Sequence, residues 1–285
     1  MKRLLSSIIF VLIICLTFSS ATISQAVDAL PKSDFYILLS NDDGYNAPGL
    51  KALAEALSPI AMVTVAAPAK QQSGAGHGIT YREAIFVSQI KNHKKIPWYA
   101  ISARPATCVH IGIENLIKTK PDLVISGINK GENLGPVTFR SGTAGAAREA
   151  AILGFPAIAT SLQGNNRDDY KASAIYVRKL VEKLISKKLL QPKLLLNINF
   201  PAGISKGIKG TKVTKLSLID ETNTYHKKHF PFFEAYKTNI TKLNIDNDPE
   251  TDINAFANGY VTITPLSIDQ TNYPELKTLK GIVND

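Results

Sequence analysis

The segment Phe35-Tyr-Ile-Leu-Leu-Ser-Asn-Asp-Asp-Gly44 joins a mostly apolar run to a pair of carboxylates, and this junction indicates the fold class. The run is about six residues long and ends at a turn, which predicts a buried parallel strand. The next segment, 48–57, starts with proline and has apolar residues at helical spacing, which predicts a helix. Open α/β sheets bind ligands at the carboxyl ends of their strands, so Asp42 and Asp43 lie where such a fold holds a ligand.

Two adjacent carboxylates repel each other unless a positive charge neutralises them, and a divalent cation is the usual solution. Asp42 and Asp43 could instead be ordinary turn residues, since Asp is common in turns. The buried strand before them favours the metal site.

Strands and helices continue to alternate up to about residue 200. Further strands are expected at 62–66, 80–87, 98–102, 122–126, 156–162 and 194–200, and further helices at 105–116, 141–153 and 168–187. This order predicts an α/β fold: a three-layer, Rossmann-like, mostly parallel sheet.

The pattern changes after residue 200. Strands are expected at 212–218 and 260–266 and a short helix beyond Tyr273, but residues 221–249 are polar, rich in aromatics and without a clear period. A stretch this long without regular structure is typical of a functional segment. Its aromatic side chains need cover, so we expect an extended arm or hairpin, at about 220–250, that packs on another subunit. These aromatic residues are Phe230, Phe232, Phe233 and Tyr236.

The first 26 residues have the features of an export signal. Lys2 and Arg3 precede a short apolar run and then small residues, with cleavage expected near Ala26 or, alternatively, after Ala21. An uncleaved membrane anchor is the alternative, but the apolar run is short for crossing a bilayer. We therefore expect an exported protein, periplasmic or secreted, with no membrane span after cleavage. The mature chain, 27–285, is expected to be a single domain with a core at 27–200 and a C-terminal part at 201–285.

The net charge favours anionic substrates. The 285-residue chain has a formal charge of +10, and loss of Lys2 and Arg3 lowers it to +8. The lysines are spread along the chain without interleaved aromatics, so no stable complex with nucleic acid is expected. Cys108 is the only cysteine after residue 26, which excludes an internal disulfide in the mature chain.

Three loops that follow predicted strands supply oxygen-bearing side chains to one edge of the sheet. Asp42 and Asp43 are on the first, Ser73 is on the second, and Asn129 and Asn133 are on the third. Carboxylate, hydroxyl and amide oxygens are hard ligands that suit Mg²⁺, Mn²⁺ or Ca²⁺.

A fourth element, Ser141-Gly142-Thr143, opens a helix, and the unpaired N–H groups of a helix N-terminus can bind an anion. A divalent ion facing a phosphate cradle predicts hydrolysis of phosphate esters.

Six motifs together resemble the SurE family, the stationary-phase survival proteins. The resemblance runs from about Phe35 to Leu266. The motifs are Ser40-Asn-Asp-Asp-Gly44 with Ala47-Pro-Gly49, Gln72-Ser-Gly-Ala-Gly-His77, Ser126-Gly-Ile-Asn129 through Asn133-Leu-Gly135, Ser141-Gly-Thr143, Gly154-Phe-Pro-Ala157 and Gly259-Tyr-Val-Thr-Ile-Thr-Pro-Leu266.

The resemblance implies a 5′/3′-nucleotidase and acid phosphatase that uses one divalent cation per subunit, Mg²⁺ or Mn²⁺ first and Ca²⁺ as the third option. It also implies a homodimer or homotetramer joined through the C-terminal arm. Metal ligation would fall to Asp42, Asp43, Ser73 and Asn129, and phosphate binding to Asn133 with Ser141, Gly142 and Thr143. Asp42 and Asp43 would be the catalytic pair, and Asp43 could orient water or act as a base.

Three further residues remain open between function and structure. His77 is a candidate contact to the phosphate or leaving group, with a structural role as the alternative. Arg104 and Arg140 depart from the family pattern, as does Thr107. Either arginine could add a charge-assisted contact to substrate, and we favour this for Arg140, whereas Arg104 is interpreted as a surface residue.

The sequence therefore predicts an exported phosphomonoesterase acting on nucleoside 5′- or 3′-monophosphates, with broader phosphate esters as further substrates. Two alternatives come from other classes: a catalytically silent protein that binds nucleotide or metal, and a basic exported nucleic-acid-binding protein.

Overall fold

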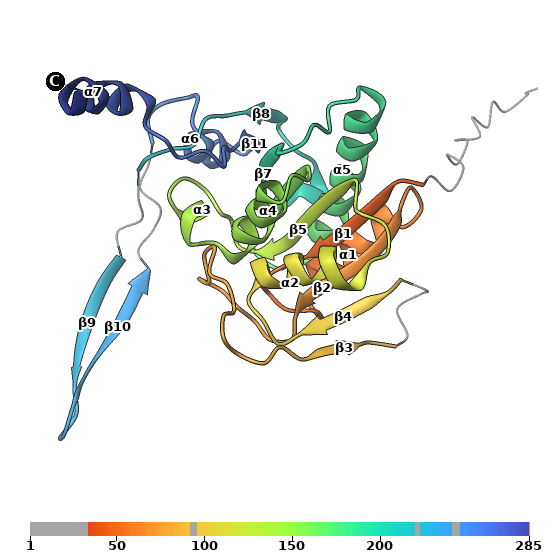
Figure 1. The fold of residues 1–285 in the computed structure, drawn as a ribbon, viewed down its shortest axis with the longest axis horizontal. Helices are drawn as coiled ribbons and strands as arrows, with labels where there is room; N and C mark the ends of the chain where they lie inside the picture. Colours follow the sequence, from red (N-terminus) through yellow and green to blue (C-terminus); the bar gives the residue numbers. More distant parts are fainter. Residues whose placement is uncertain (1–33, 92–95, 220–222, 241–245, 285) are drawn as a thin grey trace, which may run out of the picture. The chain divides into compact units, whose positions relative to one another are not determined.

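The protein is described by a computed structural model that covers residues 34–91, 96–219, 223–240 and 246–284. The export signal predicted over residues 1–26 lies outside these ranges. Within the described ranges, no helix is both long and apolar enough to cross a lipid bilayer. Figure 1 shows a central sheet flanked by helices, followed by a separate hairpin and a terminal helix.

The central sheet has nine strands in the order β3-β4-β2-β1-β5-β6-β7-β11-β8. The six strands from β4 to β7 are mutually parallel, whereas β3 and β11 run antiparallel to their neighbours β4 and β7. The strands are β1 (Tyr36–Ser40), β2 (Met62–Pro68), β3 (Val87–Gln89), β4 (Trp98–Ile101), β5 (Leu123–Lys130), β6 (Ala157–Leu162), β7 (Leu195–Phe200), β8 (Thr211–Val213) and β11 (Val261–Pro265). The predicted α/β class is confirmed.

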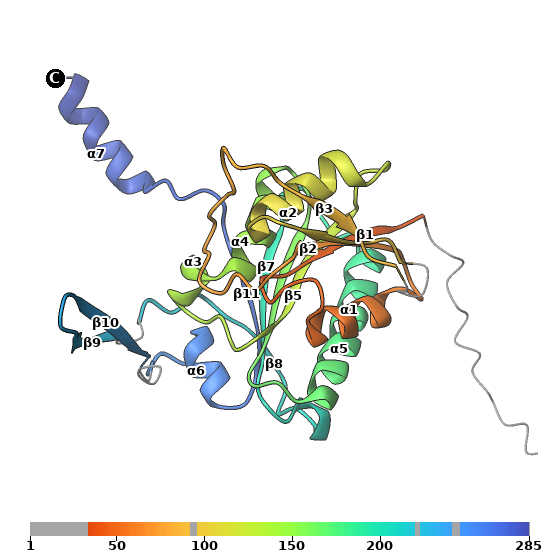
Figure 2. The same cartoon turned by 90° about the horizontal axis from the view of Figure 1, so that it is seen from below.

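Helices cover both faces of this sheet and give it three layers (Figure 2). On one face α1 (Pro48–Leu57) packs against α5 (Arg167–Ser186), and on the other α2 (Pro105–Ile111) packs against α4 (Gly142–Ile152). Each face buries its own apolar cluster, with Leu50 in the first and Ala147 in the second. The alanine-rich α4 allows close packing on β5 and β6, which holds its N-terminus firmly at the edge of the sheet.

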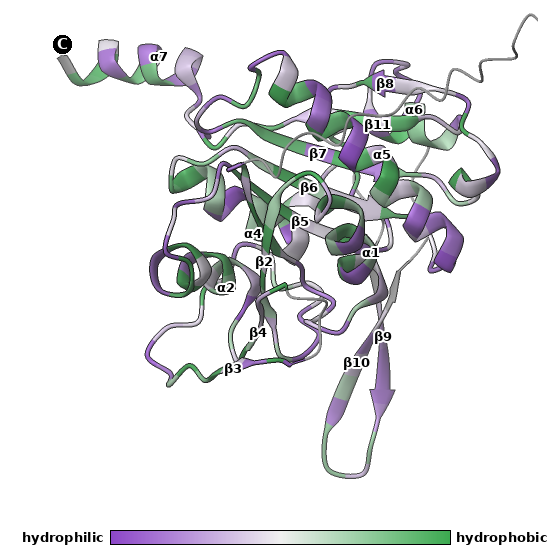
Figure 3. Ribbon diagram, turned by 90° about the vertical axis from the view of Figure 1, so that its right-hand side faces the viewer, coloured by the Kyte–Doolittle hydropathy of each residue, from purple (hydrophilic) through white to green (hydrophobic). Residues whose placement is uncertain are grey.

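The C-terminal part adds β8 and β11 to the sheet and a two-stranded hairpin of its own. The hairpin pairs β9 (Asn223–His229) antiparallel with β10 (Glu234–Ile240), inside the segment predicted to be an arm. Figure 3 shows hydrophobic residues at its turn, where Phe230 stacks on Phe233 with ring centroids 4.7 Å apart. Between the hairpin and β11 lies the short helix α6 (Asp252–Ala257), and α7 (Tyr273–Asn284) ends the chain.

Two predicted strands are wrong over most of their length. The strand expected at 212–218 is confined to β8, with only an isolated bridge at Lys215 beyond it. Residues 80–86 are not a strand, and β3 is confined to Val87–Gln89. Side chains hold this backbone instead of a ladder: the Thr80 N–H donates to Thr107 Oγ1 (2.8 Å) and the Phe86 N–H to Ser102 Oγ (2.7 Å). Arg82 also has φ 65°, which no extended strand contains.

Candidate active site

A cavity of about 480 Å³ opens at the carboxyl ends of the central strands. Residues from the first, second and third predicted loops line it together with the segment before α4. Of the predicted site residues, those in its wall are Asp42, Ser73, Asn129, Asn133, Arg140 and Ser141. Residues of all three loops thus line one cavity, whereas the predicted site residues Asp43, His77, Gly142 and Thr143 are not among its lining residues.

Asp42 is joined directly to the start of α4. The Thr143 hydroxyl donates to Asp42 Oδ1 at 2.6 Å, and both side chains are buried. Gly142 allows this approach, because a Cβ at that position would lie 2.8 Å from Asp42 Cβ and 2.9 Å from Oδ2. The Ser141 hydroxyl caps α4 by accepting from the Ala144 N–H (3.1 Å). Thr143 therefore faces the carboxylate, and its predicted contact with phosphate remains a prediction.

Both carboxylates hold their protons more tightly than usual. Burial raises the pKa of Asp42 from 3.8 to about 6, against the opposing effect of the Thr143 hydrogen bond, and the neighbouring charge of Asp43 raises it further. Burial also raises the pKa of Asp43, although the Lys130 N–H lowers it in part. Two buried carboxylates with raised pKa values lack a compensating positive charge, and a cation bound between them would supply it.

A change of register places Asn129 beside the acidic pair. The pairing of β5 with β6 shifts between Ser126 and Asn129, so the strand continues through residues that the sequence suggested were a loop. The Lys130 N–H then donates to Asp43 Oδ2 at 2.9 Å. Asn129 Nδ2 donates to the Gly131 carbonyl at 2.7 Å, which leaves its amide oxygen as the atom suited to a cation.

The donor set fits a hard divalent cation. Two carboxylates, one hydroxyl and one amide are all oxygen donors, and Mg²⁺ is usually held by one or two carboxylates while it keeps several waters. Among the described residues, no three His, Cys, Asp or Glu side chains converge as a metal site. This composition excludes a zinc site of the structural type and agrees with a site that has only two charged ligands.

Comparison with known proteins identifies the family. The model of the family described as "Survival protein SurE" matches residues 37–223. The chain belongs to the SurE family. Two proteins named "5'-nucleotidase SurE", from Desulfitobacterium hafniense strains DSM 10664 / DCB-2 and Y51, are each 42% identical over 246 residues, covering 86% of this chain and 96% of theirs. The crystal structure of the SurE protein from Aquifex aeolicus superposes with a TM-score of 0.76 at 36% identity, covering 88% of this chain and all of that one.

In this SurE family member Asn133 is fixed by a network of asparagines. Its Nδ2 donates to Ser161 Oγ (2.8 Å), its N–H donates to Asn199 Oδ1 (2.7 Å), and its carbonyl accepts from Asn197 (2.8 Å). The residue lines the cavity, and one of the two N–H groups of its side-chain amide donates to Ser161. A contact from Asn133 to phosphate remains a prediction.

His77 contacts Glu149, which agrees with the structural alternative, and its contact with phosphate remains a prediction. Its Nε2 lies 2.7 Å from Glu149 Oε2 on α4, and His77 is not among the residues that line the cavity. Arg140 does line it, next to Ser141, which agrees with the functional interpretation of that arginine.

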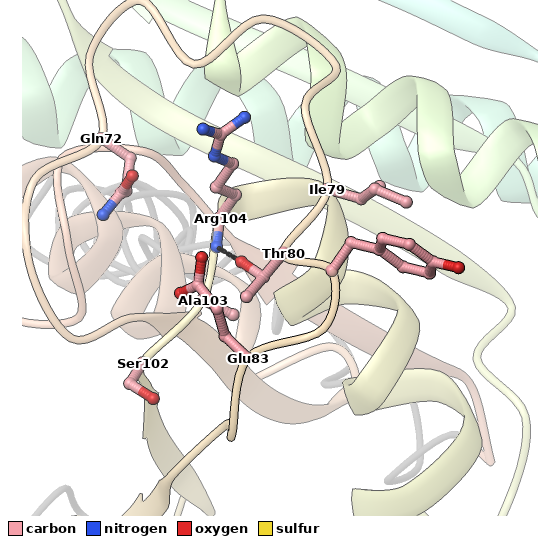
Figure 4. Close-up of a pocket in the computed structure, with 8 residues that line it drawn as sticks. Gln72, Ile79, Thr80, Glu83, Ser102, Ala103 and Arg104 are labelled. Carbon is pink, nitrogen blue, oxygen red and sulfur yellow. Dashed lines mark hydrogen bonds between the residues drawn. The ribbon is translucent and has the colours of Figure 1, made fainter.

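A second cavity, of about 300 Å³, lies beside the loop that carries Ser73 (Figure 4). Gln72 and the exposed Arg104 line this cavity. The Arg104 guanidinium packs against Gly78, because a Cβ at Gly78 would lie only 2.3 Å from Arg104 Nη1. The backbone N–H of Arg104 donates to Thr80 Oγ1 (2.9 Å). Thr107 binds the Thr80 backbone, so its unusual identity has a structural reason.

The sequence did not single out three features of the site. Lys130 lines the cavity and adds a positive charge to its wall. Asn129 and Asn133 of the same segment are predicted site residues, whereas Lys130 is not among them. Tyr225 and Thr238 of the hairpin also line the cavity. Glu149 was missed because only the fold reveals that α4 turns it toward two histidines.

Proposed function

We propose that this protein is an exported nucleotidase that uses a divalent cation to hydrolyse nucleoside 5′- or 3′-monophosphates, with broader phosphate esters as further substrates. Membership of the SurE family, with relatives named 5′-nucleotidase at 42% identity, makes the chain a nucleotidase and thus a phosphoric monoester hydrolase. Metal dependence, export and the choice of ester are the parts that this proposal adds.

The bond between Thr143 and Asp42 is the observation that carries the proposal. It joins Asp42, in the loop after β1, to the N-terminus of α4, so the proposed cation site and the proposed anion site would adjoin one cavity. A phosphate monoester needs both, because its charge must be neutralised before water can attack the phosphorus.

The side chains have separable tasks in this reaction. Asp42, Asp43, Ser73 and Asn129 would hold Mg²⁺ or Mn²⁺, which when bound supplies Lewis-acid polarisation of the phosphoryl group and lowers the pKa of water. Ser141 and Gly142, at the start of α4, favour the negative phosphate. Arg140 and Lys130 add positive charge to the cavity wall. Asp43 is the candidate to orient the attacking water.

Measurement of inorganic phosphate released from nucleoside 5′- and 3′-monophosphates tests the proposal. With Mn²⁺ the protein should release phosphate, chelation should stop the reaction, and Asp42→Asn should lower turnover at least about 100-fold. Full activity after chelation, or in the Asp42→Asn variant, would contradict metal dependence. Absence of release from every ester would support a silent binding protein instead.

A nucleic-acid-binding role is the second alternative. It would give polynucleotide binding that weakens steeply with salt and persists after chelation. The lysines are spread along the sequence, which gives this alternative little support.

We also propose that the hairpin joins subunits into a homodimer or homotetramer. Its aromatic side chains are exposed in the single chain, with Phe232 at 97% and Phe233 at 63%, and a partner would cover them. Export remains a proposal based on residues 1–26 and predicts that the mature protein starts near residue 27, which N-terminal sequencing of exported protein would check.

A further inference from the structure

The loop that carries Ser73 is held on both sides by residues of the candidate site. At its start, the Gln72 N–H donates to the Asp42 carbonyl at 2.7 Å. Further along, the Gly76 N–H donates to the Arg140 carbonyl at 2.9 Å. Ser73 therefore lies between an anchor on the acidic pair and an anchor on the segment that leads into α4.

Near the second anchor, side chains from three separate elements also contact one another. Glu149 of α4 places Oε2 at 2.7 Å from His77 Nε2 and Oε1 at 2.9 Å from His110 Nδ1. The Glu149 side chain is only 12% exposed, whereas His110, on α2, is half exposed. One carboxylate thus joins the Ser73 loop, α2 and the helix that starts at the phosphate cradle.

This anchor is strong because the carboxylate is charged and the backbones are in contact. Hydrogen bonds to an ionised carboxylate are about twice as strong as neutral ones. The hydrogen bond from His77 is the main reason that the pKa of Glu149 lies below its usual range. A Cβ at Gly145 would lie only 2.1 Å from the Gly76 carbonyl oxygen, so the loop packs directly on α4.

We propose that Glu149 is a positioning residue for the cation site. By holding His77 it fixes the loop so that Ser73 stays beside Asp42, and His110 keeps the carboxylate in place from the other side. The inference rests on the proposed function, because that function makes Ser73 a ligand of the cation. Nothing in it requires His77 to touch the substrate.

The experiment measures the dissociation constant of Mn²⁺ by calorimetry on the purified metal-free protein. Glu149→Ala should weaken Mn²⁺ binding about tenfold, in the range found when residues that orient metal ligands are removed. Glu149→Gln, which keeps the shape and one acceptor, should recover part of this loss. At saturating Mn²⁺ the kcat for a nucleoside monophosphate should return to within about threefold of the wild-type value, because excess cation compensates for a less well-placed ligand.

Glu182→Ala is the matched control. Glu182 also forms an ion pair, at 3.6 Å to Arg178, but both residues lie on α5 and line none of the cavity. Its loss should leave the Mn²⁺ dissociation constant within about twofold. His77→Asn should match the loss in Glu149→Ala, and the double variant should add little to either, because both remove one link.

The outcomes separate the two proposals. A folded Glu149→Ala protein that binds Mn²⁺ as tightly as the wild type would overturn the positioning role and leave the nucleotidase intact. Wild-type protein that binds no Mn²⁺ at all would overturn the metal-dependent function and this inference with it. If Glu149→Ala fails to fold, Glu149→Gln and His77→Asn decide: unchanged binding in both overturns the inference, and weakened binding in both supports it.

Discussion

Thr143 Oγ1 lies 2.6 Å from Asp42 Oδ1, although 101 residues separate the two in sequence. The hydroxyl supplies a hydrogen bond to a carboxylate that burial would otherwise leave poorly solvated. Asp42 is therefore kept charged at neutral pH by a group that belongs to the helix of the phosphate cradle. This relationship makes the stability of the metal-free protein depend on the charge of Asp42.

Asp42→Asn should stabilise the metal-free protein, although it lowers turnover with Mn²⁺ at least about 100-fold. Because the folded pKa of Asp42 is raised from 3.8 to about 6, the folded state binds its proton more tightly than the unfolded state, and stability falls as the pH rises through this window. The amide side chain of the variant does not ionise, so the variant does not lose stability in this pH window. Its free energy of unfolding should exceed that of the wild type by about 2 kcal/mol at pH 8, and by much less at pH 4.

Denaturant titrations of both proteins at pH 4 and pH 8, with chelator present, measure this difference. A variant that is less stable than the wild type at pH 8 would show that ionised Asp42 does not destabilise the folded state. Addition of Mn²⁺ should reverse the order by stabilising only the wild type.

Thr143→Val should destabilise the protein by about 1 to 3 kcal/mol at pH 8, because it leaves a buried carboxylate oxygen without its donor. Thr160→Val is the matched control: Thr160 is equally buried, but its hydroxyl has no hydrogen-bond partner. That variant should be neutral or slightly stabilising. Equal losses in both variants, measured by denaturant unfolding, would argue against a special role for the Asp42 contact.

Mn²⁺ affinity should depend on pH in a defined window. Below about pH 6 the cation must displace a proton from Asp42, so the apparent affinity should fall about tenfold for each pH unit. Above this pH the affinity should become much less sensitive to pH. Calorimetric titrations at several pH values check this, and an affinity that is constant between pH 4 and pH 6 would remove Asp42 from the ligand set.

Phe232→Ser should weaken assembly of the protein. The side chain is 97% exposed at the hairpin turn and should be covered by a partner subunit. Light scattering after gel filtration should show a smaller particle for this variant. Phe86→Ser, at a 72% exposed position outside the hairpin, should leave the mass unchanged. A wild-type protein that is already a monomer would contradict the proposed arm.

Long apolar runs explain why most of the core could be predicted. β1 carries the run Ile-Leu-Leu, β5 begins with Leu-Val-Ile and β7 with Leu-Leu, and a parallel sheet buried on both faces requires such apolar runs. Gly127, by contrast, suggested the end of a strand, whereas β5 passes through it to Lys130. The strand expected at 80–87 is wrong because side-chain hydrogen bonds, which leave no periodic signal, hold that segment.

The site was predictable where its chemistry lies within one short motif. Asp42 and Asp43 are adjacent, and Ser141 caps a helix, so each could be identified locally. The partner of His77 could not, because Glu149 lies 72 residues away and its side chain meets His77 only after α4 packs on the sheet. Pairings between distant helix faces and loops leave no local pattern.

Diffraction from crystals soaked in Mn²⁺ would locate the proposed cation itself. Anomalous scattering should place one Mn²⁺ per subunit at about 2.0 to 2.3 Å from oxygens of Asp42 and Asp43, with Ser73 and Asn129 completing the protein ligands. A strong peak elsewhere, or no peak at this pair of carboxylates when the wild-type protein is saturated with Mn²⁺, would contradict the account.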